Sequence, residues 1–160
     1  LKKYSDSVNK LAKKLKCKII FEPGRSIIGD TGILLSKIQY IKKGAKKDFI
    51  IIDAGMNDFM RPALYDAVHK IIPIRKSKSK LKGTIEFVGP ICESTCKFGS
   101  YKNYQKISEN DFVAITNVGA YGSSLSSNYN SRPLIAELLV NKNKIKYIRK
   151  KQDLLKLINS

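Results

Sequence analysis

One stretch determines the fold: Thr84-Ile85-Glu86-Phe87-Val88-Gly89-Pro90-Ile91-Cys92-Glu93-Ser94. It contains an apolar run, then a turn signal, then a thiol, a carboxylate and a hydroxyl in consecutive positions. Residues 84–88 form a short, mostly apolar run, which predicts a β-strand. Gly89-Pro90 ends this strand because Gly-Pro pairs break regular structure. Cys92 and Glu93 are therefore expected on a loop at a strand end, where reactive side chains are usually displayed. The simpler alternative is a buried cysteine beside a surface glutamate.

The same β-rich pattern extends over most of the chain. Turn-rich segments such as Lys43-Gly44, 55–58, 108–110 and 141–143 separate short strand-like runs. Seven strands are predicted, at 33–42, 48–54, 67–74, 83–88, 111–118, 133–140 and 144–149. Seven short strands with this punctuation favour a mainly β fold, a sandwich or a barrel. Residues 152–158 are predicted to close the chain as a short helix.

The beginning of the chain has a different character. Residues 2–16 place apolar side chains on one helical face and lysines opposite, which predicts an amphipathic helix. Residues 17–21 predict a short strand, and a helix that leads into a strand is an α/β unit. An α/β barrel needs about 250 residues, so only its last helix and strand fit here. We expect residues 1–30 to be the remnant of a truncated α/β barrel and residues 31–160 to be a C-terminal β domain.

The chain is strongly basic, with 31 Lys and Arg against 13 Asp and Glu and a net charge of +18. Such a charge is a feature of nucleic-acid-binding proteins. The excess is mostly lysine, however, and the densest run, 75–80, contains no aromatic residue on which a base could stack. We therefore expect no nucleic-acid partner, and a basic nucleic-acid-binding β domain is the weaker alternative.

The cellular compartment follows from what the sequence contains. No apolar run approaches the roughly 18 residues of a membrane span, and no signal-peptide pattern is present. The three cysteines are an odd number and suggest no disulfide framework. We expect a protein of the reducing cytoplasm without a membrane partner.

Two further stretches contain arginines where an anion could bind. The first is Glu22-Pro23-Gly24-Arg25. Its glycine allows a ligand to approach the backbone closely, and the Arg25 guanidinium can donate two parallel hydrogen bonds. The stretch 53–65 places Arg61 and Tyr65 four residues apart, on one face if this segment is helical. Pro62 fits the first turn of a helix but opposes a longer one, so a loop is the alternative.

The longest unusual stretch is 119–133, which begins Gly119-Ala120-Tyr121-Gly122. Glycines on both sides of Tyr121 indicate a tight backbone that offers the ring to a neighbour. An ordered Ω-type loop without a ligand is the alternative interpretation.

Together, these motifs resemble the diaminopimelate decarboxylase family, which are fold-type III, alanine-racemase-like enzymes dependent on pyridoxal 5'-phosphate. The resemblance covers residues 19–140 and rests on EPGR (22–25), GMNDFMRPALY (55–65), GPICES (89–94) and GAYGSSLSSNYNSRP (119–133). It implies an N-terminal α/β barrel with the Schiff-base lysine, a C-terminal β domain, and a homodimer with shared active sites. The implied reaction is the decarboxylation of meso-2,6-diaminopimelate to L-lysine and carbon dioxide.

The resemblance also implies roles for individual residues. Cys92 would be the catalytic proton donor, delivered together with Glu93 from the partner subunit. The implied substrate-binding residues are Arg25, Arg61, Tyr65, Glu93 and Tyr121. The implied cofactor-binding residues are Glu22, Pro23, Gly24, Arg25 and Tyr121. The residue types suit the task, because a thiol can supply a proton, and an amino-acid head group calls for an arginine and an acid.

The chain departs from the family pattern in two ways. Thr95 and Cys96 stand where the family usually has an acidic residue, which leaves the fine substrate contacts open. No lysine lies in the family's Schiff-base context, so we expect this piece alone neither to hold the cofactor covalently nor to decarboxylate. The alternatives are a related decarboxylase with a different substrate and a non-catalytic binding homologue.

A metal site is not expected. A zinc site would need Cys17, His69, Cys92 and Cys96, and their spacing is unlike that of known zinc sites. His69 is expected to be an ordinary strand residue.

Overall fold

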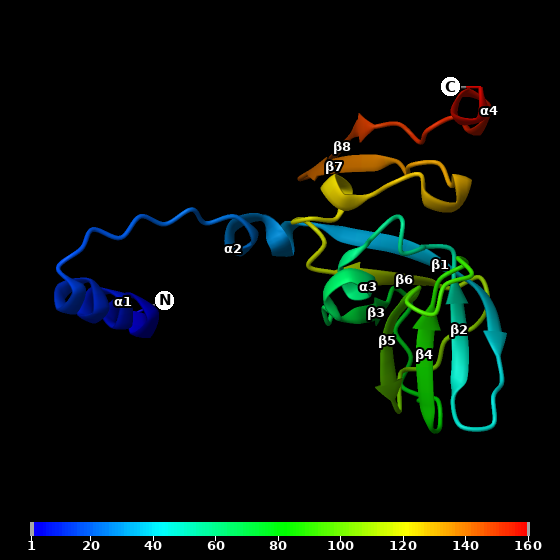
Figure 1. Ribbon diagram of the computed structural model, residues 1–160. Coiled ribbons are helices and arrows are strands. Elements are labelled where there is room, and N and C mark those ends of the chain that lie inside the picture. The colour runs from blue at the N-terminus through cyan, green and yellow to red at the C-terminus, as the bar shows by residue number, and fades with distance from the viewer. Residues whose placement is uncertain (1, 160) are drawn as a thin grey trace.

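The computed structural model describes residues 2–159, which form a curled six-stranded sheet, a separate two-stranded hairpin and four short or peripheral α-helices (Figure 1). The strands are β1 (Ile33–Lys42), β2 (Asp48–Ile52), β3 (Ile71–Pro73), β4 (Thr84–Val88), β5 (Lys97–Lys102), β6 (Phe112–Thr116), β7 (Glu137–Asn141) and β8 (Lys144–Arg149). The helices are α1 (Lys2–Leu15), α2 (Arg25–Ile28), α3 (Arg61–Tyr65) and α4 (Leu154–Ile158). The prediction of a mainly β fold is confirmed.

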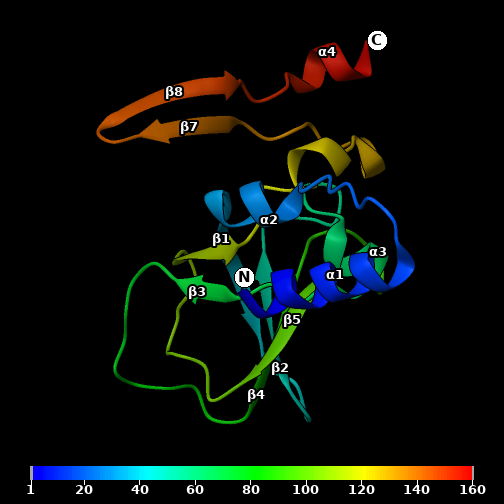
Figure 2. The ribbon, with the colours of Figure 1, turned by 90° about the vertical axis from the view of Figure 1, so that its left-hand side faces the viewer.

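The large sheet has the strand order β3-β6-β1-β2-β4-β5. Strands β2 and β4 pair in parallel, and the other neighbours pair antiparallel. The long strand β1 pairs with β6 through its first half and with β2 through its second half, with an irregularity between Ile38 and Tyr40. An irregularity of this kind bends a strand, so β1 carries the curl that is visible in Figures 1 and 2.

The core lies inside this curl. Alternate residues of β4 face it, because side chains alternate between the two faces of a strand, and both Ile85 and Phe87 are fully buried. Ile38 of β1 and Ile50 and Ile52 of β2 are fully buried against them. The apolar run before Gly89-Pro90 is thus a core strand, as the sequence predicts.

The two edges of the sheet are joined by tyrosine hydroxyls. The Tyr101 hydroxyl, on β5, donates to the His69 carbonyl at 3.0 Å and accepts from the Ile71 N–H at 2.9 Å. The Tyr104 hydroxyl donates to the Ile71 carbonyl at 3.0 Å. Burial raises the pKa of both phenols, so they remain protonated donors. These bonds connect β5 to β3 and hold the segment before β3 in place.

Several predicted bounds are wrong. Strand β3 covers only Ile71–Pro73 of the predicted 67–74, and β7 begins at 137 rather than 133. Strand β5 (Lys97–Lys102) was not predicted. Residues 17–21 are irregular and not a strand, because they have no neighbouring strand to satisfy their backbone N–H and C=O groups.

Helix α1 lies away from the sheet and is joined to α2 by an extended segment (Figure 1). Most of its apolar face is exposed, and the rings of Tyr4 and Phe21 meet edge-on with centroids 6.2 Å apart. The predicted amphipathic helix is confirmed, whereas the division of the chain at residue 30 stays a prediction. Within residues 2–159, no helix has the length and apolar character that crossing a membrane would require.

Candidate functional site

Helix α3 positions Arg61 and Tyr65 together. Pro62 occupies its first turn, where the missing N–H costs no hydrogen bond, and Asp66 ends the helix after five residues with a left-handed backbone at φ 50°. The Arg61 guanidinium lies 5.7 Å from the centroid of the Tyr65 ring. The helical alternative is therefore the correct one, and the two side chains share a face as their spacing predicts.

Tyr121 completes this cluster from a distant part of the chain. Its ring centroid lies 5.5 Å from the Arg61 guanidinium, and its backbone is left-handed at φ 59°. The loop is held by Gly119, whose N–H donates to the Gly29 carbonyl at 3.0 Å. A Cβ at Gly119 would lie 2.0 Å from the carbonyl oxygen of Ile28, so only glycine allows this approach. The contact brings the loop of Tyr121 against the segment that carries Arg25.

Arg25 and His69 face a shared hollow of about 300 Å³. Its lining consists of Arg25, Ser26, Gly29, Asp30, Val68, His69 and Asn117. His69 is buried, and its Nε2 lies 3.4 Å from the Arg61 Nε, within hydrogen-bond reach. The hollow and the Arg61 cluster are therefore adjacent parts of one site.

The expectation that His69 lies on a strand is wrong, whereas its role stays a prediction. His69 precedes β3 and lies in an irregular segment, and its side chain touches one of the predicted substrate-binding residues. A single histidine four residues after Tyr65 is a weak signal, and its contact with Arg61 depends on how the chain turns at Asp66.

Cys92 and Glu93 lie on an exposed loop directly after β4, as the sequence predicts. The ends of the loop are joined because the Gly89 N–H donates to the Cys96 carbonyl at 2.8 Å. The Tyr129 hydroxyl donates to Glu93 Oε1, and this hydrogen bond to the carboxylate raises the pKa of Tyr129. Tyr129 is a functional candidate that the sequence analysis did not identify, although it lies within the stretch 119–133.

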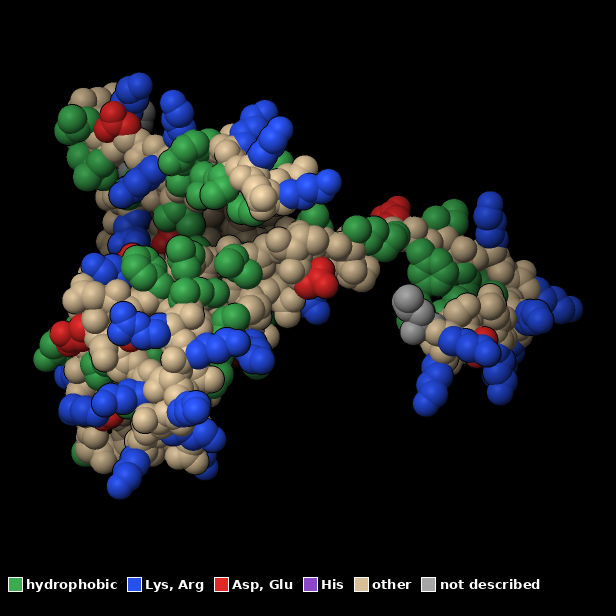
Figure 3. All heavy atoms as spheres, turned by 180° about the vertical axis from the view of Figure 1, so that it is seen from behind, with side chains coloured by type: hydrophobic (Ala, Val, Ile, Leu, Met, Phe, Trp, Pro, Cys, Tyr) green, Lys and Arg blue, Asp and Glu red, His purple; other side chains and the backbone are tan. Residues whose placement is uncertain are grey.

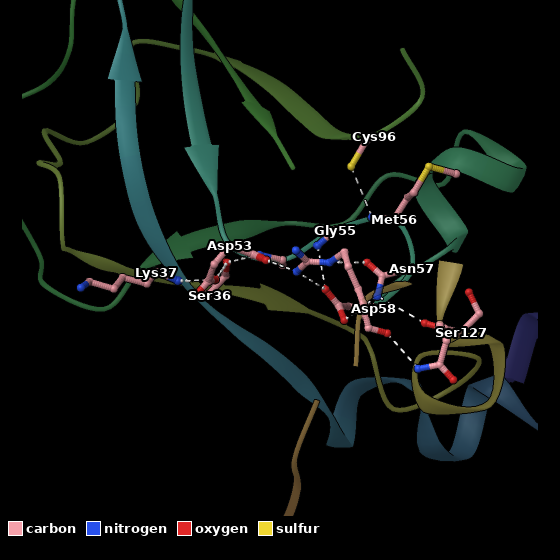
Figure 4. Close-up of polar contacts among 12 residues, drawn as sticks. Ser36, Lys37, Asp53, Gly55, Met56, Asn57, Asp58, Cys96 and Ser127 are labelled. Carbon is pink, nitrogen blue, oxygen red and sulfur yellow. Dashed lines mark hydrogen bonds and ion pairs between the residues drawn. The ribbon is translucent and has the colours of Figure 1, made fainter. Parts of the chain in front are cut away.

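Cys96 does not face the same side as Cys92. It is buried, and its Sγ accepts from the Met56 N–H at 3.4 Å (Figure 4). Cys96 therefore supports the turn at Gly55-Met56 through its thiol and the ends of the Cys92 loop through its backbone. The described part of the chain contains no group of three or more His, Cys, Asp or Glu side chains that could hold a metal ion.

The turn that precedes α3 rests on a buried polar network (Figure 4). Arg132 Nε donates to Asn57 Oδ1 at 3.0 Å, and its Nη2 donates to the Asp53 carbonyl at 2.8 Å. The same nitrogen lies 3.5 Å from Asp58 Oδ2. Burial raises the pKa of Asp58, while the Gly55 N–H and Arg132 oppose the increase. The two-pronged guanidinium of Arg132 thus binds its own chain and holds the turn that positions Arg61.

Replacing Arg132 with Lys should lower the free energy of unfolding by about 1–3 kcal/mol, because an ammonium cannot make all three contacts and leaves buried acceptors unpaired. Chemical denaturation of the complete protein measures the change. Arg75→Lys is the matched control, since the Arg75 side chain is exposed and lies 3.9 Å from Asp111. Equal stability of the two variants would contradict the assigned role.

Glu93 lies at a different hollow from Arg25. This second hollow has a volume of about 380 Å³, and Glu93, Ser94, Cys96 and residues of β1, β2 and β4 line it. The two hollows share no lining residue. Within one chain, the predicted site residues therefore form two groups, one around Arg61 and one on the Cys92 loop.

Residues 7–119 match the pyridoxal-dependent decarboxylase family, over the part described as its C-terminal sheet domain. The chain belongs to this family. A diaminopimelate decarboxylase from Aquifex aeolicus is 42% identical over 149 residues, which cover 93% of this chain and 35% of that protein. One from Zymomonas mobilis is 43% identical with the same coverage of both chains.

Solved structures of decarboxylases in this family agree with the fold. The diaminopimelate decarboxylase of Helicobacter pylori, in complex with L-lysine, superposes with a TM-score of 0.80 at 42% identity. The match covers 98% of this chain and 38% of that one. The chain thus spans a little over a third of the length of these decarboxylases.

The residues around Arg25 fit the anionic end of pyridoxal phosphate. Within the described residues, Arg25 makes no ion pair, and a side chain added at Gly24 would meet nothing within 4 Å, so the backbone is open to a ligand. Tyr121, whose ring is half exposed, lies on the loop that contacts Gly29 of the same segment. No lysine is among the residues that line this hollow. Arg25 and Gly24 therefore offer a cation and an open backbone that suit an anionic group such as a phosphate.

Proposed function

We propose that this chain is the C-terminal part of a diaminopimelate decarboxylase, which converts meso-2,6-diaminopimelate to L-lysine and carbon dioxide. The proposal rests mainly on the surroundings of the Arg61 side chain. Its guanidinium lies near two tyrosine rings, and among residues 2–159 it has no acidic partner. An arginine held in this way is suited to bind a carboxylate with two parallel hydrogen bonds. The names of the relatives support the same substrate.

Each part of the site has a chemical role in this proposal. Pyridoxal phosphate, when bound, supplies the electron sink that allows a carbon–carboxylate bond to break. Arg25 contacts the phosphate and the substrate. Arg61, with Tyr65 and Tyr121, holds the carboxylate of the amino-acid head group that does not react, and Glu93 holds its ammonium. The thiol of Cys92 delivers a proton to the carbon that has lost carbon dioxide.

The proposed enzyme is a cytoplasmic homodimer with shared active sites. The separation of the two groups of site residues supports this arrangement. Cys92 and Glu93 are exposed on their loop, and the hollow at Glu93 shares no residue with the hollow at Arg25. Two copies of the chain would let the Cys92 loop of one subunit meet the Arg61 cluster of the other.

Other functions find less support. The alternative substrate rests on Thr95 and Cys96, and the thiol of Cys96 is engaged by the Met56 N–H. Lys and Arg side chains are spread over the face of the molecule in Figure 3 and do not gather into one stripe. This face therefore shows no continuous basic path for a nucleic-acid backbone.

The complete protein, expressed with pyridoxal phosphate, should release carbon dioxide from meso-diaminopimelate and form L-lysine. Ornithine and arginine should react at least about 100-fold less efficiently, because they lack the second amino-acid head group that Arg61 and Glu93 would bind. Carbon dioxide release from the three substrates measures this preference. Activity with ornithine or arginine alone would contradict the substrate, and no activity with any of them would favour a binding homologue.

A further inference from the structure

We propose that His69 is a positioning residue, which, as a neutral hydrogen-bond acceptor, orients Arg61 for the substrate carboxylate. The proposal rests on the proposed function, because it assigns a carboxylate to Arg61. It starts from three properties of His69, namely its burial, its hydrogen bonds and its position between two arginines.

The surroundings of His69 determine where its proton lies. Its Nδ1 lies 2.9 Å from the carbonyl oxygen of Thr116. A carbonyl only accepts hydrogen bonds, so Nδ1 must carry the proton. In the neutral ring, Nε2 is then an acceptor, and Arg61 Nε, which can only donate, lies 3.4 Å away. The two contacts select one tautomer.

The ring has little freedom to turn away from Arg61. The Phe59 ring packs edge-on against it, with centroids 4.6 Å apart. The backbone of His69 is held by the Tyr101 hydroxyl, which donates to its carbonyl at 3.0 Å. Thr116, the Nδ1 partner, is itself fixed because its N–H donates to the Lys70 carbonyl at 2.9 Å. His69 is therefore a rigid support for Arg61.

The contact with His69 decides which part of Arg61 is available to a ligand. Nε points at the histidine, and the Tyr65 and Tyr121 rings lie near the guanidinium. The terminal nitrogens Nη1 and Nη2 make no ion pair with the described residues. These two nitrogens form a two-pronged donor that matches a carboxylate.

A neutral acceptor is better suited to this position than a carboxylate. An acid beside Arg61 Nε would form an ion pair and compete with the substrate for the guanidinium. The charged groups that face His69 are Arg61 from α3 and Arg25 from α2, and Asp30 lines the same hollow. Burial and the two arginines lower the pKa of His69 and outweigh the hydrogen bond to the Thr116 carbonyl, which raises it. His69 therefore stays neutral at neutral pH and leaves the charge of Arg61 for the substrate.

The test compares His69→Phe with His69→Gln in the complete, cofactor-loaded enzyme. Phenylalanine keeps a ring against Phe59 but removes the acceptor, whereas glutamine keeps a neutral acceptor. We expect His69→Phe to raise KM for meso-diaminopimelate about tenfold with a smaller change in kcat. His69→Gln should stay within about threefold of the natural enzyme. Equal KM values for His69→Phe and the natural enzyme would overturn the proposal.

The pH dependence provides a readout that a purely structural role would not change. Protonation of His69 removes the acceptor and adds a third positive charge beside Arg25 and Arg61. KM of the natural enzyme should therefore rise as pH falls through the lowered pKa of His69, and KM of His69→Phe should lack this rise. An identical pH profile for both enzymes would overturn the proposal.

Two measurements do not depend on turnover. Calorimetry should show about tenfold weaker binding of L-lysine to His69→Phe and unchanged binding of 1,5-diaminopentane, which has no carboxylate. An imidazole ¹⁵N spectrum, assigned by the signal lost in His69→Gln, should show a protonated Nδ1 and an unprotonated Nε2. A protonated Nε2 would overturn the proposal. Failure of the natural enzyme to decarboxylate diaminopimelate would instead refute the proposed function.

Discussion

Replacing Cys92 with Ala in the complete enzyme is expected to lower kcat for meso-diaminopimelate by about 10²–10⁴-fold, because the variant loses the group that delivers the proton. KM should change little, since Arg61 and Glu93, the proposed substrate-binding residues, remain in place. The location of Cys92 supports this expectation, because its thiol is exposed at the end of a core strand. Steady-state kinetics of L-lysine formation measure both constants.

Two control variants separate a catalytic thiol from a general effect of cysteine replacement. Cys17→Ala removes another exposed thiol, in the irregular segment after α1, and should leave kcat unchanged. Cys92→Ser keeps the size and a hydroxyl proton but donates it less readily, so it should retain more activity than Cys92→Ala. A kcat for Cys92→Ala within threefold of the natural enzyme would show that another group supplies the proton.

The parts of the fold that the sequence predicts correctly are those set by local pattern. The alternation in residues 84–88 and the Gly-Pro break identify a core strand followed by an exposed loop, and the structure agrees. Strand β5 (Lys97–Lys102) was missed because it contains two lysines and Gly99, residues that disfavour strands. Its pairing with β4 and the burial of Phe98 stabilise it nevertheless. Tertiary contacts therefore stabilise a strand that the local residue preferences do not predict.

In the candidate site too, the local contact could be predicted from the sequence and the long-range contacts could not. Arg61 and Tyr65 could be placed together from their spacing, since one turn of helix fixes their relative position. The contacts of His69 with Thr116 and of Tyr129 with Glu93 join residues 47 and 36 positions apart. No sequence periodicity predicts pairs that are so distant.

Arg132 shows a further limit of sequence reasoning. It lies in the same stretch as Tyr121, and an arginine in such a stretch suggests ligand binding as readily as structural support. Its partners are Asn57, the Asp53 carbonyl and the acidic side chain of Asp58, all within the chain. Only the folded arrangement distinguishes Arg132, which supports the turn, from Arg61, which has no acidic partner among the described residues.

Replacing Arg61 with Lys is expected to raise KM for meso-diaminopimelate about 100-fold, although the charge is kept. A lysine ammonium is a point donor, so it cannot make two parallel hydrogen bonds to a carboxylate. It also loses the contact with His69 and the placement near Tyr65 and Tyr121. Charge-assisted hydrogen bonds contribute about 1.5–3 kcal/mol each, so the loss of one or two of them accounts for the expected factor. Steady-state kinetics at neutral pH measure the change.

The control for this variant is Arg75→Lys, which changes an exposed arginine outside both hollows and should leave KM unaltered. A second comparison uses ligands that differ only in their carboxylates. Arg61→Lys should weaken the binding of L-lysine about as much as it raises KM, while the binding of 1,5-diaminopentane stays unchanged. If both ligands weakened equally, Arg61 would shape the site without contacting the carboxylate. If neither weakened, Arg25 would be the residue that binds this carboxylate, because it is the other arginine at the site without an ion pair to the described residues.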